Sequence, residues 1–140
     1  MRSIAQILNE SKTIAIVGLS NKPDRASYGV AEYLQGHGYQ IIPVNPSYAG
    51  QTILGERVCA TLQEAADTLA TSGRRIDIVD CFRKSEDIPP IARDAIAVRA
   101  GCLWMQLDIE NQAAADLARA AGLDVVVNHC IKIEHRSLQA

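Results

Sequence analysis

The amino-acid sequence predicts an α/β fold of the Rossmann-like, doubly wound type, with a mainly parallel sheet and helices on both of its faces. Short aliphatic runs alternate with segments of helical periodicity along all 140 residues, which is the pattern of repeated strand–helix units. The first aliphatic run, residues 13–18, contains no charged residue, as expected for a strand that helices cover on both sides. The length suits a single domain over residues 1–140.

A helix, a strand and a second helix are predicted at the amino-terminal end. Residues 4–8 place apolar side chains at helical spacing, and the strand at residues 13–18 follows a short polar break. Residues 19–27 form a polar loop. From Tyr28 to about His37, apolar side chains again recur at helical spacing and glycines follow, which predicts the second helix.

The next predicted elements are two strands and a helix. Residues 39–44 are an aliphatic run that leads into turn-forming residues, which indicates the second strand. A short third strand is predicted at residues 53–58. A helix is predicted over residues 61–70, because Thr61 and Glu64 have the spacing of a capping box.

A fourth strand and another helix follow. Residues 76–82 have an aliphatic centre, although Asp77 and Asp80 interrupt it. Ser85 is expected to cap a helix that ends near Gly101. The two prolines of that helix are compatible with it because they lie near its start.

The last predicted elements repeat the alternation. Residues 102–107 are predicted to form the fifth strand, residues 110–121 a helix and residues 123–127 the last strand. The tail, residues 128–140, is polar and has no clear periodicity, so no element is assigned to it.

Composition narrows the functional classes. Basic residues number 14 and acidic residues 16, and only 4% of residues are aromatic, so neither charge nor base stacking favours a nucleic-acid partner. No apolar run approaches the roughly 20 residues of a membrane-spanning helix. The four cysteines form no C-x-x-C pair, and we interpret them as reduced thiols of a cytoplasmic protein.

The loops that follow the parallel strands are expected to build the functional site. The carboxyl ends of parallel strands lie on one edge of the sheet. In the usual order of this fold, the first and fourth strands flank the point where ligands bind. The residues expected to converge there are Gly18, Ser20, Asn45, Pro46, Phe82, Arg83, Gln106 and Leu107.

The loop after the first strand lacks the features of common nucleotide sites. From Gly18 it reads Gly-Leu-Ser-Asn-Lys-Pro, so two of the three glycines of a G-x-G-x-x-G motif are missing. The second strand ends in Val44 and Asn45, where an NAD site would have an acidic residue for the ribose hydroxyls. No Gly-Lys-Ser/Thr sequence occurs, which argues against a P-loop.

The same loop has the parts of an anion-binding site. Ser20 and Ser27 carry hydroxyls, Lys22 and Arg25 are cationic, and the amino end of a helix follows them. Free N–H groups at a helix start carry partial positive charge, and an arginine can donate two hydrogen bonds to a phosphate. The alternative is that these charges are only solvated and that Ser27 merely caps the helix.

Nine short segments of the chain match the pattern of one known family. They are Val17-Gly18-Leu19-Ser20, Lys22-Pro23-Asp24-Arg25, Ser27-Tyr28, Pro43-Val44-Asn45-Pro46, Leu54-Gly55-Glu56, Phe82-Arg83, Trp104-Met105-Gln106, Ala120-Ala121-Gly122-Leu123 and Cys130-Ile131-Lys132-Ile133-Glu134-His135. Together they resemble the stand-alone CoA-binding domain family, which is similar in fold to the CoA-binding amino-terminal domain of the succinyl-CoA synthetase α subunit. The resemblance covers nearly the whole chain.

The resemblance implies a site for coenzyme A or an acyl-CoA. The loop at residues 18–28 and the helix terminus after it would hold the phosphates. The rigid segment around Pro46 would lie against the adenosine, and the residues after the fourth strand would contact the pantetheine or the diphosphate. The candidate binding residues are Gly18, Ser20, Lys22, Arg25, Ser27, Tyr28, Val44, Asn45, Pro46, Phe82, Arg83 and Gln106.

The expected function is non-catalytic binding of CoA. The three histidines, His37, His129 and His135, show neither a metal-ligand spacing nor a nucleophile–base pattern. Two alternatives stay open: a small NAD(P)-dependent oxidoreductase on the same fold, and a regulatory module that docks on a partner enzyme in response to CoA. The sequence also leaves open whether the protein forms a homodimer.

Overall fold

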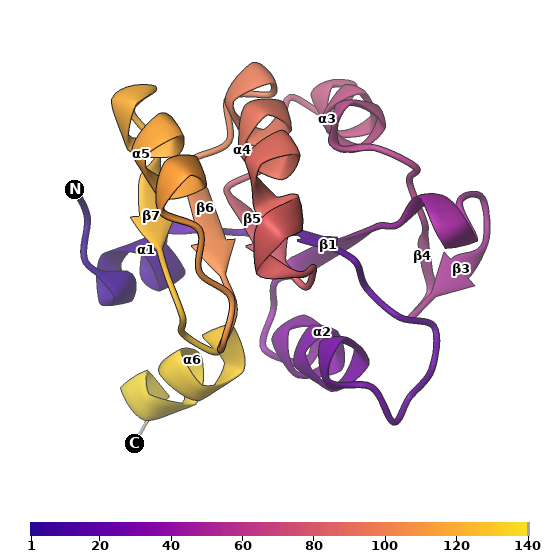
Figure 1. Cartoon of the computed structure of the whole chain (residues 1–140). Coiled ribbons are helices and arrows are strands. Elements are labelled where there is room, and N and C mark those ends of the chain that lie inside the picture. The colour runs from indigo at the N-terminus through magenta and orange to yellow at the C-terminus, as the bar shows by residue number, and fades with distance from the viewer. Residues whose placement is uncertain (140) are drawn as a thin grey trace.

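Five parallel strands form the central sheet of the computed structural model, which describes residues 1–139 (Figure 1). The strand order is β2-β1-β5-β6-β7, so the chain reverses its direction of travel across the sheet between β1 and β5, as the sequence predicts. The strands are β1 (Thr13–Val17), β2 (Gln40–Val44), β5 (Ile78–Cys81), β6 (Cys102–Met105) and β7 (Asp124–Val126).

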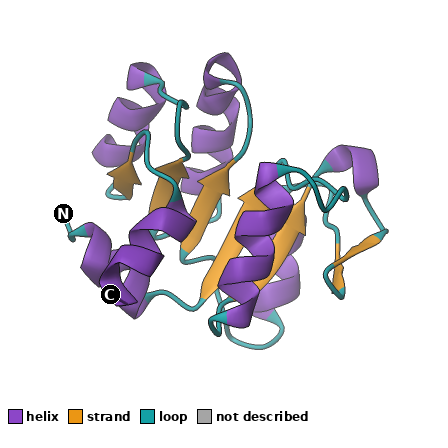
Figure 2. Ribbon diagram, turned by 90° about the horizontal axis from the view of Figure 1, so that it is seen from below, coloured by secondary structure: helices purple, strands orange, loops and turns teal. Residues whose placement is uncertain are grey.

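Helices cover both faces of this sheet (Figure 2). The apolar side chains of α1 (Ile4–Glu10), α2 (Ala26–Gly36) and α6 (Ile131–Gln139) share one buried cluster with one face of the strands. Those of α3 (Leu62–Ala70), α4 (Ile88–Ala97) and α5 (Gln112–Ala120) share the cluster on the other face. The predicted fold class is therefore confirmed.

The helix α2 begins earlier than the sequence pattern predicts. Its first residue is Ala26, and its amino-terminal cap is Arg25, which makes no side-chain capping hydrogen bond within the described chain. Ser27 is thus a buried residue inside the helix and not its cap. The apolar periodicity that begins at Tyr28 misses the first two helical residues, because Ala26 and Ser27 are not large apolar side chains.

Two helix starts show which capping predictions hold. The Thr61 Oγ accepts a hydrogen bond from the Glu64 N–H at 3.1 Å, and the Glu64 carboxylate accepts one from the Ala60 N–H at 3.2 Å, so the cap predicted for α3 is present. Ser85 does not cap α4. It begins a 3₁₀ turn (Ser85–Asp87), and its hydroxyl accepts a hydrogen bond from the Glu110 N–H at 3.0 Å.

The predicted third strand is a small hairpin outside the main sheet. Its strands β3 (Thr52–Ile53) and β4 (Glu56–Arg57) pair antiparallel. Leu54 and Gly55, which join them, both have positive φ angles of 52° and 79°. A two-residue turn with positive φ at both positions matches the twist of a hairpin, so the segment turns back on itself instead of continuing as one strand.

The carboxyl-terminal tail forms the helix α6, which the sequence did not predict. Its start is fixed by distant residues: the Gln106 carbonyl oxygen Oε1 accepts a hydrogen bond from the Ile131 N–H at 3.1 Å, and the Trp104 indole donates one to the His129 carbonyl at 2.8 Å. Trp104 is fully buried. Contacts with β6 thus hold a segment whose own sequence has little helical signal.

Asp80 is a fully buried acidic residue in the middle of the central sheet. It lies in β5, in register with Ile16 of β1 and Trp104 of β6, and its side chain is fully buried. Neither carboxyl oxygen has a hydrogen-bond partner within residues 1–139. Burial raises the pKa of Asp80 well above its usual range, because the charged form has no compensating contact.

This burial predicts a specific pH dependence of stability. The folded Asp80 holds its proton at pH values where the unfolded chain has lost it, so its contribution to stability is complete below about pH 4 and falls by about 1.4 kcal/mol per pH unit above that, until the pH passes the folded pKa. The Asp80→Asn variant lacks this titration. The free energy of unfolding of the variant minus that of the wild type should therefore increase between pH 5 and pH 8, measured by urea denaturation. A difference that does not change with pH would contradict the prediction.

Candidate functional site

The loops after β1 and β5 meet at the carboxyl edge of the sheet with their backbones in contact. Gly18 has a positive φ of 89°, and a Cβ atom built on it would lie 2.3 Å from the Phe82 carbonyl oxygen. The Gly18 N–H donates a hydrogen bond to the Val44 carbonyl at 2.9 Å, and the Phe82 N–H donates one to the Val17 carbonyl at 2.9 Å. Only glycine fits this position, for both its space and its φ.

The loop between β1 and α2 is held by its own serines. The Ser27 hydroxyl oxygen accepts a hydrogen bond from the Ser20 N–H at 3.0 Å, and the Ser20 hydroxyl oxygen accepts one from the Lys22 N–H at 3.1 Å. The loop curves around a cleft of about 310 Å³. Its lining consists of Gly18, Ser20, Lys22, Arg25, Ala26, Ser27, Tyr48 and Phe82. We call this the first cleft.

The first cleft is cationic. Lys22 and Arg25 are exposed at its rim, and neither forms an ion pair with a carboxylate among residues 1–139. The helix α2 also begins here without a side-chain cap in the described chain, whereas Ser3, Thr61 and Asn111 cap α1, α3 and α5. The arrangement therefore offers two cationic side chains and an uncapped helix terminus to an anion.

A second cleft lies beyond the same edge, on the side of α3 and α4. It measures about 290 Å³, and Val44, Pro46, Thr61 and Arg83 are among the residues that line it. We call this the second cleft. Six of the twelve predicted residues line the first cleft and three line the second, so nine of them surround this edge of the sheet.

Asn45 connects the loops instead of lining either cleft. Its amide nitrogen donates a hydrogen bond to the Leu19 carbonyl at 3.0 Å. Its amide oxygen accepts hydrogen bonds from the Ser47 N–H at 3.0 Å and from the Arg83 guanidinium at 3.4 Å. The side chain thus joins the loops after β1, β2 and β5, and it orients Arg83.

Tyr28 and Gln106 lie outside both clefts. Tyr28 is half-buried and packs against the apolar cluster between α2 and the sheet. Gln106 was expected at the rim of the site, but its side chain is buried and its oxygen holds the start of α6. Alternation along the strand places a residue on a face of the sheet, but it does not show which segment covers that face.

Tyr48 and Thr61 are two of the nine residues that line the clefts without having been predicted at the site. Tyr48 lines the first cleft from the 3₁₀ turn Pro46–Tyr48 that follows β2. Thr61, which was assigned only a capping role, lines the second cleft. The position of Tyr48, just after a strand that ends at the binding edge, was a usable signal, because aromatic side chains are scarce in this chain.

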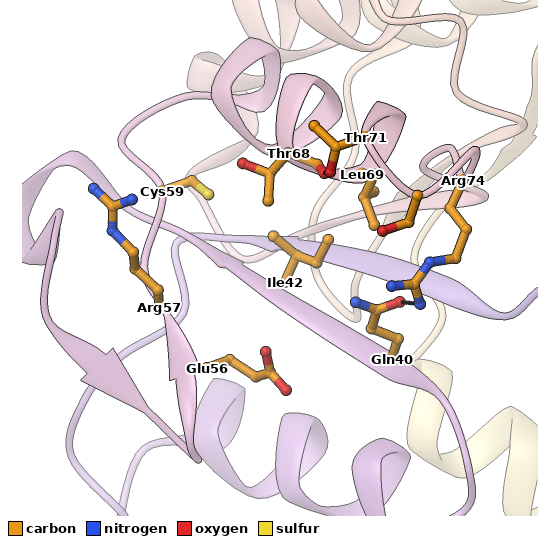
Figure 3. A pocket seen from close by; sticks show the side chains of 10 residues that line it. Gln40, Ile42, Glu56, Arg57, Cys59, Thr68, Leu69, Thr71 and Arg74 are labelled. Carbon is orange, nitrogen blue, oxygen red and sulfur yellow. Dashed lines mark hydrogen bonds between the residues drawn. The ribbon is translucent and has the colours of Figure 1, made fainter.

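A further cavity of about 230 Å³ lies at the outer edge of β2, between α3 and the β3–β4 hairpin (Figure 3). Ile42, Leu69 and Cys59 form its apolar part, and the guanidinium of Arg74 is hydrogen-bonded to Gln40 at its rim. None of the twelve predicted site residues lines it. The cavity is therefore separate from the carboxyl-edge clefts.

Other kinds of site are not apparent in the described chain. No group of three or more metal-ligating side chains occurs among residues 1–139. His129 pairs with Glu134 at 2.9 Å, with no third ligand in that part of the chain. None of the helices that these residues form has the length and apolar character needed to cross a lipid bilayer.

The Gly18→Ala variant tests the contact between the two loops. The added methyl group must displace the Phe82 carbonyl, and the alanine must adopt a left-handed backbone conformation. We therefore expect a loss of about 2–5 kcal/mol in the free energy of unfolding. Gly29→Ala is the matched control: Gly29 lies in α2 with nothing within 4 Å of its added Cβ, and a gain of about 0.5–1 kcal/mol is expected. Chemical denaturation measures both. Equal effects would show that the close approach is not a constraint.

The cysteines should differ in reactivity. Burial raises the pKa of Cys59, Cys81 and Cys102, and the thiolate is the reactive form. Cys130 is half-exposed at the start of α6. In the native protein at pH 8, iodoacetamide should therefore modify Cys130 first, as read by peptide mass spectrometry, while the denatured chain reacts at all four. Early modification of Cys81 would contradict the packing described here.

Comparison with known proteins identifies the family. A family model described as a CoA binding domain matches residues 12–136. The uncharacterized protein YneT of Bacillus subtilis (strain 168) is 38% identical over 132 residues, which make up 94% of this chain and 91% of the relative. A Thermus thermophilus structure described as cell-free ID.343 has 30% identity over 96% of each chain and a TM-score of 0.88.

Two further structures show the range of similarity. A hypothetical protein from Pyrococcus horikoshii OT3 is 34% identical, with a TM-score of 0.88 over 98% of this chain and 90% of its own. The structure of RSP in complex with beta-NADH has a TM-score of 0.61 at 17% identity, over 96% of this chain and 62% of RSP, and this distant likeness shows the fold alone. The family match spans both clefts, and it confirms the resemblance seen in the sequence: the chain belongs to the family of CoA-binding domains.

Proposed function

We propose that this protein binds coenzyme A or an acyl-CoA at the carboxyl edge of its sheet, with the loop between β1 and α2 around the phosphates. The observation that carries this proposal is the first cleft, where Lys22 and Arg25 flank the uncapped start of α2. Membership of the CoA-binding domain family supports the choice of ligand.

The chemistry of the first cleft suits the phosphates of CoA. CoA carries a diphosphate and a 3′-phosphate, and each can accept hydrogen bonds from backbone N–H groups and from a guanidinium. The missing side chain of Gly18 lets the Phe82 carbonyl approach closely, which brings the loops after β1 and β5 together beside the cleft. Arg25 stands at the cap position of α2, so its positive charge adds to that of the helix terminus.

The second cleft suits the less polar parts of the same ligand. Val44 and Pro46 offer an apolar wall, and Arg83 is positioned between the wall and the Gly18 backbone by its hydrogen bond to Asn45. We assign the adenosine to this wall. Tyr48, on the turn after β2, joins the proposed contacts because it lines the neighbouring first cleft.

The end of β2 favours CoA over NAD. An NAD site uses a carboxylate at this position to hold the ribose hydroxyls, whereas here the position holds Asn45, whose amide is already bonded to the protein. A phosphorylated ribose is better tolerated without a carboxylate at the end of β2; the two carboxylates that line the second cleft, Asp87 and Asp94, lie on its α4 side. The likeness to the NADH complex of RSP concerns the fold and does not favour a nicotinamide ligand.

The proposed role is binding without turnover. The histidine–carboxylate pair of the described chain, His129 with Glu134, has no nucleophile hydrogen-bonded to it among residues 1–139. Binding of this kind suits a CoA carrier or a module that reports CoA to a partner enzyme. A pull-down that depends on CoA would favour the module.

Calorimetry tests the proposal directly. CoA should bind more tightly than dephospho-CoA, NADH or AMP, and the affinity should fall as salt is added, because the contacts are largely ionic. Arg25→Ala should weaken CoA binding about 13- to 160-fold, the range expected for one hydrogen bond to a charged group.

The control for Arg25→Ala is Arg136→Ala. Arg136 is also exposed, but it lies on α6 and lines neither cleft, so its removal should leave the affinity unchanged. Failure of the wild-type protein to bind CoA would refute the proposal. Equal losses in the two variants would refute the assigned location.

A further inference from the structure

The burial of Asp80 lowers the stability of the fold, and no hydrogen bond compensates for it. A buried carboxyl group without a partner loses its hydrogen bonds to water and gains none, and both of its oxygens are in that position within residues 1–139. An aliphatic side chain would fill the same place in the sheet at no such cost. A buried unsatisfied group of this kind calls for a functional explanation.

Asp80 faces the same side of the sheet as Phe82, which lines the first cleft. Its neighbours in register, Ile16 and Trp104, belong to the apolar cluster under α2, so Asp80 faces the same side of the sheet. Phe82 follows two residues later and packs against the same cluster. Alternate residues of a strand share a face, so Phe82 lies on the same face as Asp80, two residues nearer the carboxyl edge, and it lines the first cleft.

The Phe82 ring can rotate while its backbone stays in place. Its backbone is fixed by the hydrogen bond to Val17 and by the close approach of Gly18. Its side chain is only half-buried and carries no polar group that would tie it down. Rotation of the ring about its own side-chain bonds therefore requires no change in the backbone, and such rotations are fast for partly exposed side chains.

We propose that Asp80 is the inner end of the first cleft and that, when the Phe82 ring turns aside, its carboxyl group hydrogen-bonds the uncharged pantetheine arm of CoA. This inference rests on the function proposed above. It adds a hydrogen bond that recognises the neutral pantetheine arm, whereas the exposed cations bind only the phosphates.

The chemistry of the two groups is complementary. Burial raises the pKa of Asp80 and so favours its protonated form, which offers both an O–H donor and a carbonyl acceptor. The pantetheine arm carries amide and hydroxyl groups that are donors and acceptors without charge. A phosphate at the same depth would have to be desolvated with no cation beside it, so the inner position discriminates against the charged end.

Two variants and two ligands separate this contact from a general structural effect. Asp80→Val removes the hydrogen-bonding group, and Asp80→Asn keeps a neutral donor and acceptor. The ligands are CoA and adenosine 3′,5′-bisphosphate, which lacks the pantetheine arm. Asp80→Val should weaken CoA binding roughly 2- to 13-fold, the range for one neutral hydrogen bond, and leave the bisphosphate affinity unchanged. Asp80→Asn should retain most of the CoA affinity.

Infrared spectroscopy gives a readout that a purely structural role would not move. The carbonyl band of the protonated Asp80, assigned by its loss in Asp80→Asn, should shift when CoA binds and stay in place when the bisphosphate binds. Ile78→Val is the matched control, since Ile78 is buried on the same strand and the same face, and it should change neither affinity.

The outcomes distinguish the two proposals. CoA affinity that is unchanged in Asp80→Val, or an equal loss for both ligands, overturns the role of Asp80 while leaving CoA binding intact. Wild-type protein that binds the bisphosphate and CoA with equal affinity also overturns it, because the pantetheine arm then contributes nothing. Absence of CoA binding in the wild type overturns the proposed function itself.

Discussion

The contact between the Gly18 backbone and the Phe82 carbonyl is the constraint on which the binding edge depends. It brings the loops after β1 and β5 together at the point where the strand order reverses. The hydrogen bonds from Gly18 to Val44 and from Phe82 to Val17 link the same point to β2. Three strand ends therefore share one rigid junction, and a side chain at Gly18 would force them apart.

The two clefts lie on opposite sides of this junction, and each takes part of its lining from it. Gly18 and Phe82 contribute to the first cleft, and Val17 and Arg83 contribute to the second. Backbone hydrogen bonds thus fix the spacing between the clefts, while the exposed Lys22 and Arg25 are free to adapt. A ligand that spans both clefts would contact a backbone of fixed geometry, with two mobile cationic side chains at the first cleft. This arrangement suits a long, flexible molecule with charged and uncharged parts.

Much of this arrangement is visible in the sequence, because it follows from local patterns. The uninterrupted aliphatic runs place the strands, and the handedness of parallel connections then places their carboxyl ends together. What the sequence does not show depends on partners far along the chain. The tail folds as α6 because Gln106 and Trp104 bind its start, and Gln106 is for that reason buried and not at the rim. Similarly, the turn at Leu54 and Gly55 depends on backbone angles that an aliphatic pattern does not encode.

Asp77, which precedes β5, and Asp80, which lies in it, differ in their hydrogen-bond partners. In sequence, Asp77 and Asp80 are equivalent interruptions of one aliphatic run. In the structure, the Asp77 carboxylate accepts hydrogen bonds from the Lys12 and Thr13 N–H groups at 2.8 and 3.0 Å, so it satisfies the start of β1 and is sufficiently explained by the fold.

Asp80 receives no such bond in the described chain, although Asn45, another buried polar side chain of this sheet edge, has both ends of its amide engaged. Near the binding edge, the fold therefore provides hydrogen-bond partners for the buried side chain of Asn45 but not for that of Asp80. A carboxyl group that is left unpaired here, two residues before Phe82 on the same face of the strand, is better explained by a partner that arrives from outside than by packing.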